Sequence, residues 1–407
     1  MKIFVTCSIF VALLLIASCN HKQDEKKTEP KKGTYGYDSA FLAKYDSTFI
    51  ELKDESGSAR VIISPRWQGR VMTSTSTGPE GNSYGWLNYD LLKARKYKKH
   101  FNPIGGEERL WFGPEGGQFS LYFAKGDSFK IDKWQVPPVI DTIEYKPTAN
   151  SGGQAQFAAD AVIKNYSGYE FVFLIERRVR LLRAPEVESI LGAKIPQGVQ
   201  HVAFETLNRI ENKSPMQWKK ETGLMSIWLL GMMTPTDSTT VIIPFHPSEN
   251  SKSLITTSYF GEIPADRLTI KDSVLYFRCD GRYRSKIGLP PSIAKPVAAS
   301  YDFSRNVLTV ISFNVNDVGM YVNSKWEIQR DPYSGDVVNS YNDGPLGNGE
   351  QLGPFYELES SSAAKELKRA ESQTYVQVTS HFEGDYEGLK ELAKNILGVN
   401  LDEINKK

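Results

Sequence analysis

The segment Tyr169–Leu182, which reads YEFVFLIERRVRLL, carries the strongest fold signal in the chain. Aromatic and branched apolar residues fill its first half and recur in its second half, and neither Gly nor Pro interrupts it. This composition favours an extended strand. Ordinary strands have about five or six residues. A run of this length therefore predicts one strand of a wide, twisted β-sheet.

Similar runs recur on both sides of this segment, separated by clusters of Gly, Pro, Asn and Asp. They span residues 59–64, 70–75, 119–124, 239–245, 274–277 and 307–314. Helical patterns are few and short, at residues 89–95, 363–370 and 386–397. No linker divides residues 35–400. The pattern predicts an all-β protein, a large antiparallel β-sandwich with few short helices, built as one domain over residues 35–407.

Composition excludes several classes of function. The 49 basic and 48 acidic residues nearly cancel, so no electrostatic case exists for a nucleic-acid partner. The chain has no metal-binding motif and no phosphate-binding loop of recognised spacing, so we expect no metal and no cofactor. Aromatic residues are abundant, with 7 Trp, 20 Tyr and 20 Phe, and their rings suit either a sugar ligand or a β-sheet core. We expect a monomer.

The N-terminus carries a secretion signal. Lys2 precedes an apolar run at residues 9–16, which is too short to span a membrane. The sequence Ile16-Ala17-Ser18-Cys19 is similar to the bacterial lipobox, in which the cysteine is acylated and the chain is cut before it. We expect a lipoprotein signal peptide over residues 1–18 and a lipid on Cys19. An ordinary signal peptide with a chance cysteine is the alternative.

Residues 19–34 are charged and carry no large apolar side chain, so they are expected to form a disordered tether. No Asp follows Cys19 directly, which by the bacterial sorting rule indicates the outer membrane, on its periplasmic side or at the cell surface. More than one acyl chain on the N-terminus gives stable anchoring. Cys279 is the one cysteine left in the folded part, which excludes an internal disulfide there.

The segment 102–118, NPIGGEERLWFGPEGGQ, combines two Gly pairs with charged and aromatic residues. Glu107, Glu108, Arg109 and Trp111 supply carboxylate acceptors, a fork of donors and a stacking face, which is a plausible set for binding a sugar. The alternative is a hairpin loop with a structural salt bridge.

Three other segments carry candidate residues. Asn208 and Trp228 flank a polar turn, where a binding and a structural role are equally supported, and Asp343 lies in a polar loop. Arg282, Arg284 and Lys286 alternate, so they share one strand face, which we expect to be solvated. Glu357 and Glu359 also share a strand face, beside aromatic residues. A carboxylate buried there has a raised pKa.

A family resemblance rests on four of these segments. GGEERLWFGPEGGQFSLYF, ETGLMSIWLLGM, NSYNDGP and GPFYELESSS are similar to those of a family of uncharacterised bacterial lipoproteins, over nearly all of residues 40–400. That family's fold is expected to resemble the galactose mutarotase-like β-supersandwich of aldose 1-epimerases. The resemblance implies a carbohydrate ligand.

It also implies roles for single residues. Glu359, in Leu358-Glu359-Ser360, matches the catalytic base of an epimerase, and Arg109 matches its substrate-binding arginine. An imidazole would supply the acid, but the stretch that carries it in an epimerase has no histidine here, which leaves His100 or His381. Two alternatives remain. One is a non-catalytic glycan-binding lipoprotein. The other is a lyase or hydrolase that pairs Glu107 or Glu108 with Glu359.

Overall fold

The computed structural model describes residues 29–404. The predicted signal peptide, the lipid-bearing Cys19 and most of the predicted tether lie outside the described residues. The last tether residues contact the folded domain: the Ser83 amide donates to the Gly33 carbonyl at 3.1 Å. The Thr34 side chain caps the first helix by accepting from the Tyr37 amide. The ordered chain therefore joins the domain at Gly33.

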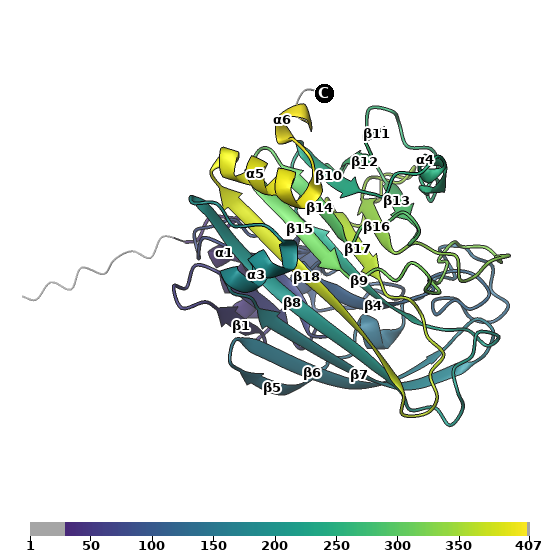
Figure 1. Cartoon of the computed structure of the whole chain (residues 1–407). Helices are drawn as coiled ribbons and strands as arrows, with labels where there is room; N and C mark the ends of the chain where they lie inside the picture. Colours follow the sequence, from purple (N-terminus) through teal and green to yellow (C-terminus); the bar gives the residue numbers. More distant parts are fainter. Residues whose placement is uncertain (1–28, 405–407) are drawn as a thin grey trace, which may run out of the picture.

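Three sheets make up the domain (Figure 1). The largest runs in the spatial order β11 (Leu268–Lys271), β12 (Val274–Arg278), β10 (Thr239–Pro244), β14 (Val297–Asp302), β15 (Val307–Phe313), β18 (Ser372–Gly384), β8 (Val199–Asn212), β7 (Glu170–Leu181), β6 (Gln154–Lys164) and β5 (Lys146–Ser151). A five-stranded sheet has the order β13 (Ser285–Leu289), β16 (Val338–Asn342), β17 (Tyr356–Ser361), β9 (Ser226–Met233) and β4 (Arg109–Gly113). The smallest contains β1 (Ile50–Lys53), β2 (Arg60–Ser64) and β3 (Arg70–Thr75).

The two smaller sheets together face the ten-stranded sheet. Antiparallel bridges from Val71 to Glu108 and from Gly85 to Met233 connect the small sheet to the edge of the five-stranded one. All neighbouring strands within the three sheets pair antiparallel. The prediction of a large antiparallel β-sandwich is therefore confirmed.

The predicted long strand is β7, and it shows the alternation that a sandwich requires. Phe171, Phe173, Ile175, Arg177 and Val179 are buried, while the residues between them are partly exposed. Phe173 reaches across to Phe112 of β4, with ring centroids 5.4 Å apart. Its inward face thus packs on the five-stranded sheet and supplies the main core.

Short helices cover the remaining surfaces. They are α1 (Tyr35–Tyr45), α2 (Tyr89–Ala94), α3 (Ala184–Leu191), α4 (Ser251–Leu254), α5 (Tyr386–Leu397), α6 (Leu401–Ile404) and the 3₁₀ turn η1 (Pro138–Ile140). Helix α5 buries Leu389 and Leu392 on the outer face of the ten-stranded sheet, where Figure 1 shows it beside α3. Within residues 29–404, no helix has the length and apolar content to cross a bilayer.

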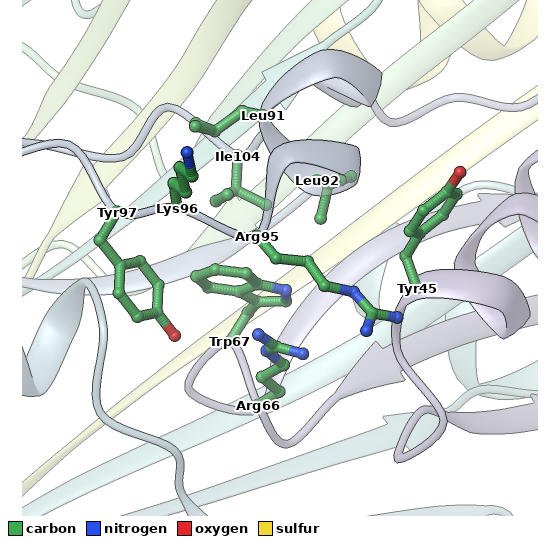
Figure 2. Close-up of a pocket in the computed structure, with 9 residues that line it drawn as sticks. All are labelled: Tyr45, Arg66, Trp67, Leu91, Leu92, Arg95, Lys96, Tyr97 and Ile104. Carbon is green, nitrogen blue, oxygen red and sulfur yellow. The ribbon is translucent and has the colours of Figure 1, made fainter.

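Helices α1 and α2 build a separate core cluster on the small sheet. Leu42 of α1 and Leu92 of α2 bury their side chains with Trp67 and Ile104. Figure 2 shows Leu92 and Ile104 beside the Trp67 ring. This cluster lies close to the first described residues, because residues 31–34 lead directly into α1.

Two local predictions were wrong. Residues 119–124 form bends and no strand, because Leu121, Tyr122 and Phe123 are all buried among other side chains. Residues 363–370 are irregular and not helical: Ala364 bridges to Met320, and the Leu367 carbonyl accepts from the Trp218 amide. In both segments tertiary contacts outweigh the local preference.

Charged side chains lie buried between the two large layers. Arg177 of β7 and Glu108 form an ion pair at 2.9 Å, and both side chains are fully buried. Arg177 also donates to the Gly69 carbonyl and to Asn208. Glu108 accepts from Gln377 of β18 at 2.8 Å. The network thus connects β7, β8 and β18 of one layer to the edge of the other.

We expect Arg177→Ala to lower the free energy of unfolding by about 3–5 kcal/mol, because it leaves the Glu108 carboxylate buried without its cation. Urea denaturation of the purified domain measures this loss.

Lys213→Ala is the matched control, because the Lys213–Glu211 pair is partly exposed. Its loss should stay below about 1 kcal/mol. Equal losses in the two variants would contradict a clamping role for Arg177.

Candidate functional site

Strand β17 sorts its side chains to two faces. The Tyr356 hydroxyl is hydrogen-bonded to Ser300 of β14 at 2.8 Å, and the Ser360 hydroxyl donates to Gln377 of β18 at 2.7 Å. These residues therefore face the ten-stranded sheet. Because side chains alternate along a strand, Glu357 and Glu359 point to the opposite face, away from that sheet. This second face carries the candidate site.

Strand register brings the other candidates to the same face. Arg109 of β4 and Glu359 of β17 both pair with Leu230 of β9. Trp111, two residues further along β4, pairs with Trp228 of β9. Residues in register across an antiparallel sheet share a face, so the sheet gathers these four predicted residues.

Glu359 is fully buried and holds its two oxygens in different surroundings. Its Oε2 atom accepts from Lys286 Nζ at 2.8 Å and from Trp228 Nε1 at 3.0 Å. Both donors suit an ionised carboxylate. Its Oε1 atom has no hydrogen-bond partner among the described residues.

Arg109 is held in a similar one-sided way. One terminal nitrogen forms an ion pair with Glu357 at 2.6 Å, while Nε and the other terminal nitrogen have no partner among the described residues. The guanidinium lies over the Trp111 ring, 4.3 Å from its centroid, and 5.4 Å from that of Phe101. This stacking fixes the plane of the guanidinium.

Aromatic rings surround these charges. Trp111 contacts Trp228 and Trp134 with centroid separations of 5.7 and 6.4 Å, and Trp134 stacks on Trp326 at 6.1 Å. The indole N–H group of Trp111 is buried and has no acceptor among the described residues, whereas Trp134 is hydrogen-bonded to Glu115 and lowers its pKa. We call these four tryptophans the tryptophan shell.

A glycine pair brings part of this shell into place. A Cβ atom on Gly116 would lie 2.2 Å from the Lys325 carbonyl oxygen, so no larger residue fits there. Gly117 has φ +81°, a conformation that glycine adopts without strain. The close approach allowed by these glycines places Trp326, next to Lys325, beside Glu115.

Carboxyl groups outnumber cations in the site. Burial raises the pKa of Glu357; Arg109 opposes this rise and Glu359 adds to it. Burial also raises the pKa of Glu115, against the effect of Lys286. Asp336 and Asp343, close by, have raised pKa values for the same reason. Each of these groups therefore keeps its proton to a higher pH than a solvated carboxyl does.

Exposure rises toward one side of the site. The side chain of Glu359 is 0% exposed and that of Lys286 is 13% exposed. Glu115, Tyr259 and Trp326 are also partly exposed. Lys286 lies over the rings of Trp228 and Tyr259. The cluster therefore approaches solvent through these partly exposed side chains.

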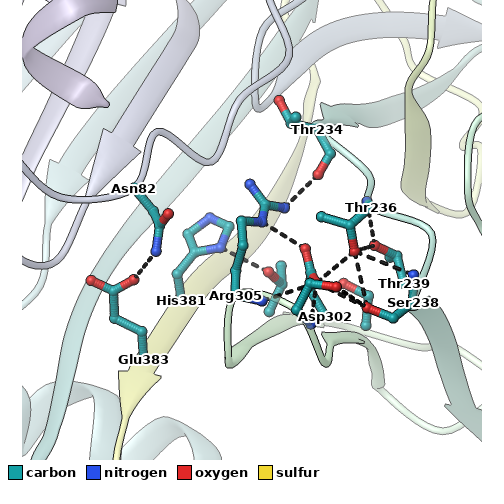
Figure 3. A network of polar contacts seen from close by, with 12 residues as sticks. Asn82, Thr234, Thr236, Ser238, Thr239, Asp302, Arg305, His381 and Glu383 are labelled. Carbon is teal, nitrogen blue, oxygen red and sulfur yellow. Dashed lines mark hydrogen bonds and ion pairs between the residues drawn. The ribbon is translucent and has the colours of Figure 1, made fainter. Parts of the chain in front are cut away.

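Four predicted residues lie elsewhere, between the sheets. Glu108 and Asn208 belong to the Arg177 network. Glu107 is hydrogen-bonded to His381 at 2.5 Å, and the other ring nitrogen of His381 is hydrogen-bonded to Thr309. Figure 3 shows the His381 ring in this buried network, near the pair Asn82 and Glu383. The structure does not bring these four residues to Glu359.

Two predicted residues flank the site. His100 is partly buried, and its Nδ1 atom lies 2.9 Å from the Trp134 carbonyl oxygen. Asp343 is buried, accepts from the Tyr341 hydroxyl and from the Gly353 amide, and raises the pKa of Glu357. No hydrogen bond or ion pair between either residue and Glu359 occurs in the described part of the chain.

Several residues of the site were not predicted from the sequence. Lys286 was expected on a solvated strand face, and this was wrong: pairing of β13 with β16 turns it onto the site. Trp134, Trp326 and Tyr259 come from irregular segments with no periodic pattern. The signal for Glu115 was its place before a glycine pair. Within residues 29–404, no set of His, Cys, Asp and Glu side chains is arranged to hold a metal ion.

Comparison with known proteins gives similarity at the level of strand arrangement. Search of curated proteins gave no match. Slr1438 from Synechocystis sp. PCC 6803 has 12% identity and a TM-score of 0.48, covering 83% of this chain and 96% of its own. A galactose mutarotase related enzyme from Lactobacillus acidophilus has 9% identity and a TM-score of 0.45, covering 82% and 97%. A galactose mutarotase-like protein from Lactobacillus casei ATCC 334 has 9% identity and a TM-score of 0.47, covering 82% and 99%.

Similarity of this extent carries no argument about chemistry, so the site is interpreted from its own geometry. A family match is more extensive. Residues 33–407 match the family described as "Family of unknown function (DUF6786)". The match begins at Gly33, whose carbonyl accepts from the Ser83 amide of the domain. Because the match spans nearly the whole chain, this protein belongs to that family of unknown function.

Proposed function

We propose that the cluster around Glu359 binds a carbohydrate and interconverts its anomers, as an aldose 1-epimerase does. One observation carries this proposal: Glu359 has one oxygen held by Lys286 and Trp228, and a second, buried oxygen without a partner. A carboxylate fixed in this way is ready to accept a proton from a ligand hydroxyl.

The remaining free groups suit a sugar. Arg109 offers two unpaired nitrogens, Trp111 offers an indole N–H and Glu359 offers an oxygen, so donors and an acceptor occur together. Sugar hydroxyls both donate and accept hydrogen bonds. The apolar C–H faces of a sugar ring pack well on the tryptophan shell. Arg109 is the proposed substrate clamp.

The proposed proton transfer uses two carboxyl groups. Glu359 removes the proton from the anomeric hydroxyl, a C=O bond forms at C1, and the bond from C1 to the ring oxygen breaks. Glu115, whose pKa is raised by burial, gives its proton to the ring oxygen. Rotation about C1–C2 and the reverse steps return both protons. A carboxylic acid takes the role expected of an imidazole, because neither His100 nor His381 contacts Glu359.

The same proposal includes the place of action. With a lipid on Cys19, the domain would be held at the outer membrane, where it meets oligosaccharides outside the cytoplasm. The sequence of residues 16–19 supports this part of the proposal.

Glu359→Gln should abolish catalysed anomer exchange, with a loss of about a hundredfold or more, because the amide cannot take the proton. Saturation-transfer NMR on a panel of reducing sugars at neutral pH measures the exchange rate. Thermal shift with the same sugars measures binding, which the isosteric variant should retain.

The matched control is Glu350→Gln, an exposed carboxyl in the loop that precedes β17. It should exchange at the rate of the unaltered protein. If the unaltered protein bound sugars but did not exchange their anomers, a glycan-binding role would take the place of the isomerase activity. If it neither bound sugars nor exchanged anomers, the proposed carbohydrate site would be rejected.

The exchange rate should also fall as pH rises. Burial raises the pKa of Glu115, so its proton is present below that pKa and is lost as pH increases through it. Since the ring oxygen needs this proton, the alkaline limb of the rate profile should follow the ionisation of Glu115. In Glu115→Gln the residual rate should show no such limb.

A pH–rate profile of both forms over neutral to alkaline pH provides the measurement. If Glu115→Gln kept the limb at its original position, Glu115 would not be the acid.

A further inference from the structure

A cluster of cations, all but Lys93 without an ion pair in the described part of the chain, lies at the end of α2 and in the segment that follows it. Residues 93–99 read KARKYKK, and all seven are exposed. Arg66 lies next to this segment across Trp67 (Figure 2). We call Arg66, Lys93, Arg95, Lys96, Lys98 and Lys99 the basic surface.

We propose that the basic surface binds the anionic headgroups of a membrane leaflet. Its cations have few ionic partners: within residues 29–404, their one ion pair joins Lys93 to Asp90 at 3.9 Å. Arg95 donates to the Lys44 carbonyl at 3.3 Å, which directs its guanidinium without neutralising it. The whole chain is nearly neutral, so this positive charge is a local feature.

Aromatic rings accompany these cations. Arg66 lies 5.5 Å from the Trp67 ring and Arg95 lies 5.8 Å from the Tyr45 ring. Tyr97 is 52% exposed. Figure 2 shows the side chains of Arg66 and Arg95 beside the Trp67 ring. Trp67 is buried and Tyr45 is partly exposed, so Tyr97 is the exposed ring among these three. An exposed aromatic ring beside cations is typical of surfaces that contact lipid headgroups.

The course of the chain points to the same partner. Lys32 lies over the Tyr89 ring of α2 at 5.1 Å, so the chain enters the domain next to the basic surface. Cys19 precedes Glu29 by 29 − 19 = 10 residues. An extended chain of that length spans at most about 36 Å. A lipid on Cys19 would hold Glu29 within that distance of the bilayer, and Lys32, which follows three residues later, contacts α2 beside the basic surface.

The test uses the chain from Asn20 to Lys407, which lacks the lipid-bearing cysteine. It keeps every core residue, because Tyr35 is the first residue of the three core clusters. It is sedimented with vesicles of phosphatidylcholine alone and with phosphatidylcholine containing about a third of phosphatidylglycerol. We expect binding to the anionic vesicles only, and a decrease as salt rises from about 0.05 to 0.3 M.

The triple variant Lys96→Glu, Lys98→Glu, Lys99→Glu should bind the anionic vesicles at least about tenfold more weakly. Lys219→Glu, Lys365→Glu, Lys368→Glu is the matched control, because it makes the same change in net charge at exposed lysines outside the basic surface. It should bind nearly as well as the unaltered chain.

Equal losses in the two triple variants would overturn the proposal, since net charge alone would then explain binding. No binding to anionic vesicles at low salt would also overturn it. Because the lipid is absent and sugar exchange is measured separately, failure here leaves the proposed isomerase untouched.

Discussion

The buried ion pair between Arg177 and Glu108 determines how the two large layers meet. Neither charge is exposed, so the pair is stable only while hydrogen bonds from both layers satisfy it. Fixing Glu108 toward the ten-stranded sheet leaves the next residue, Arg109, on the opposite face of the edge strand. The register of β4, β9 and β17 then aligns Arg109 with Glu359. The site is thus a consequence of how the sandwich is clamped.

The sequence was a good guide to the sheets and a poorer one to the segments between them. Alternation and β-branched content predicted β7 well, because its inward side chains must meet the facing sheet. Residues 119–124 have the same composition but bury consecutive side chains, and no local pattern distinguishes them from a strand. The same limit applies to residues 363–370, where the backbone bonds to distant segments.

The site residues also fall into those that local sequence could predict and those that depend on tertiary contacts. Glu359 and Glu357 share a face through strand periodicity alone, and family resemblance added Arg109. Glu107, adjacent to Glu108, bonds to a strand of the facing sheet, and this depends on an edge pairing that a single sequence does not reveal. Lys286 joins the site because β13 pairs with β16, again a tertiary fact.

The unequal oxygens of Glu359 have a stereochemical consequence. Two donors bind the same atom, so the carboxyl group cannot turn about its last carbon–carbon bond without breaking both contacts. The two lone-pair directions of the other oxygen are then fixed relative to the sheet. A hydroxyl of the proposed sugar ligand would therefore meet this group along a fixed direction, and the strand itself would limit the handedness of the sugar.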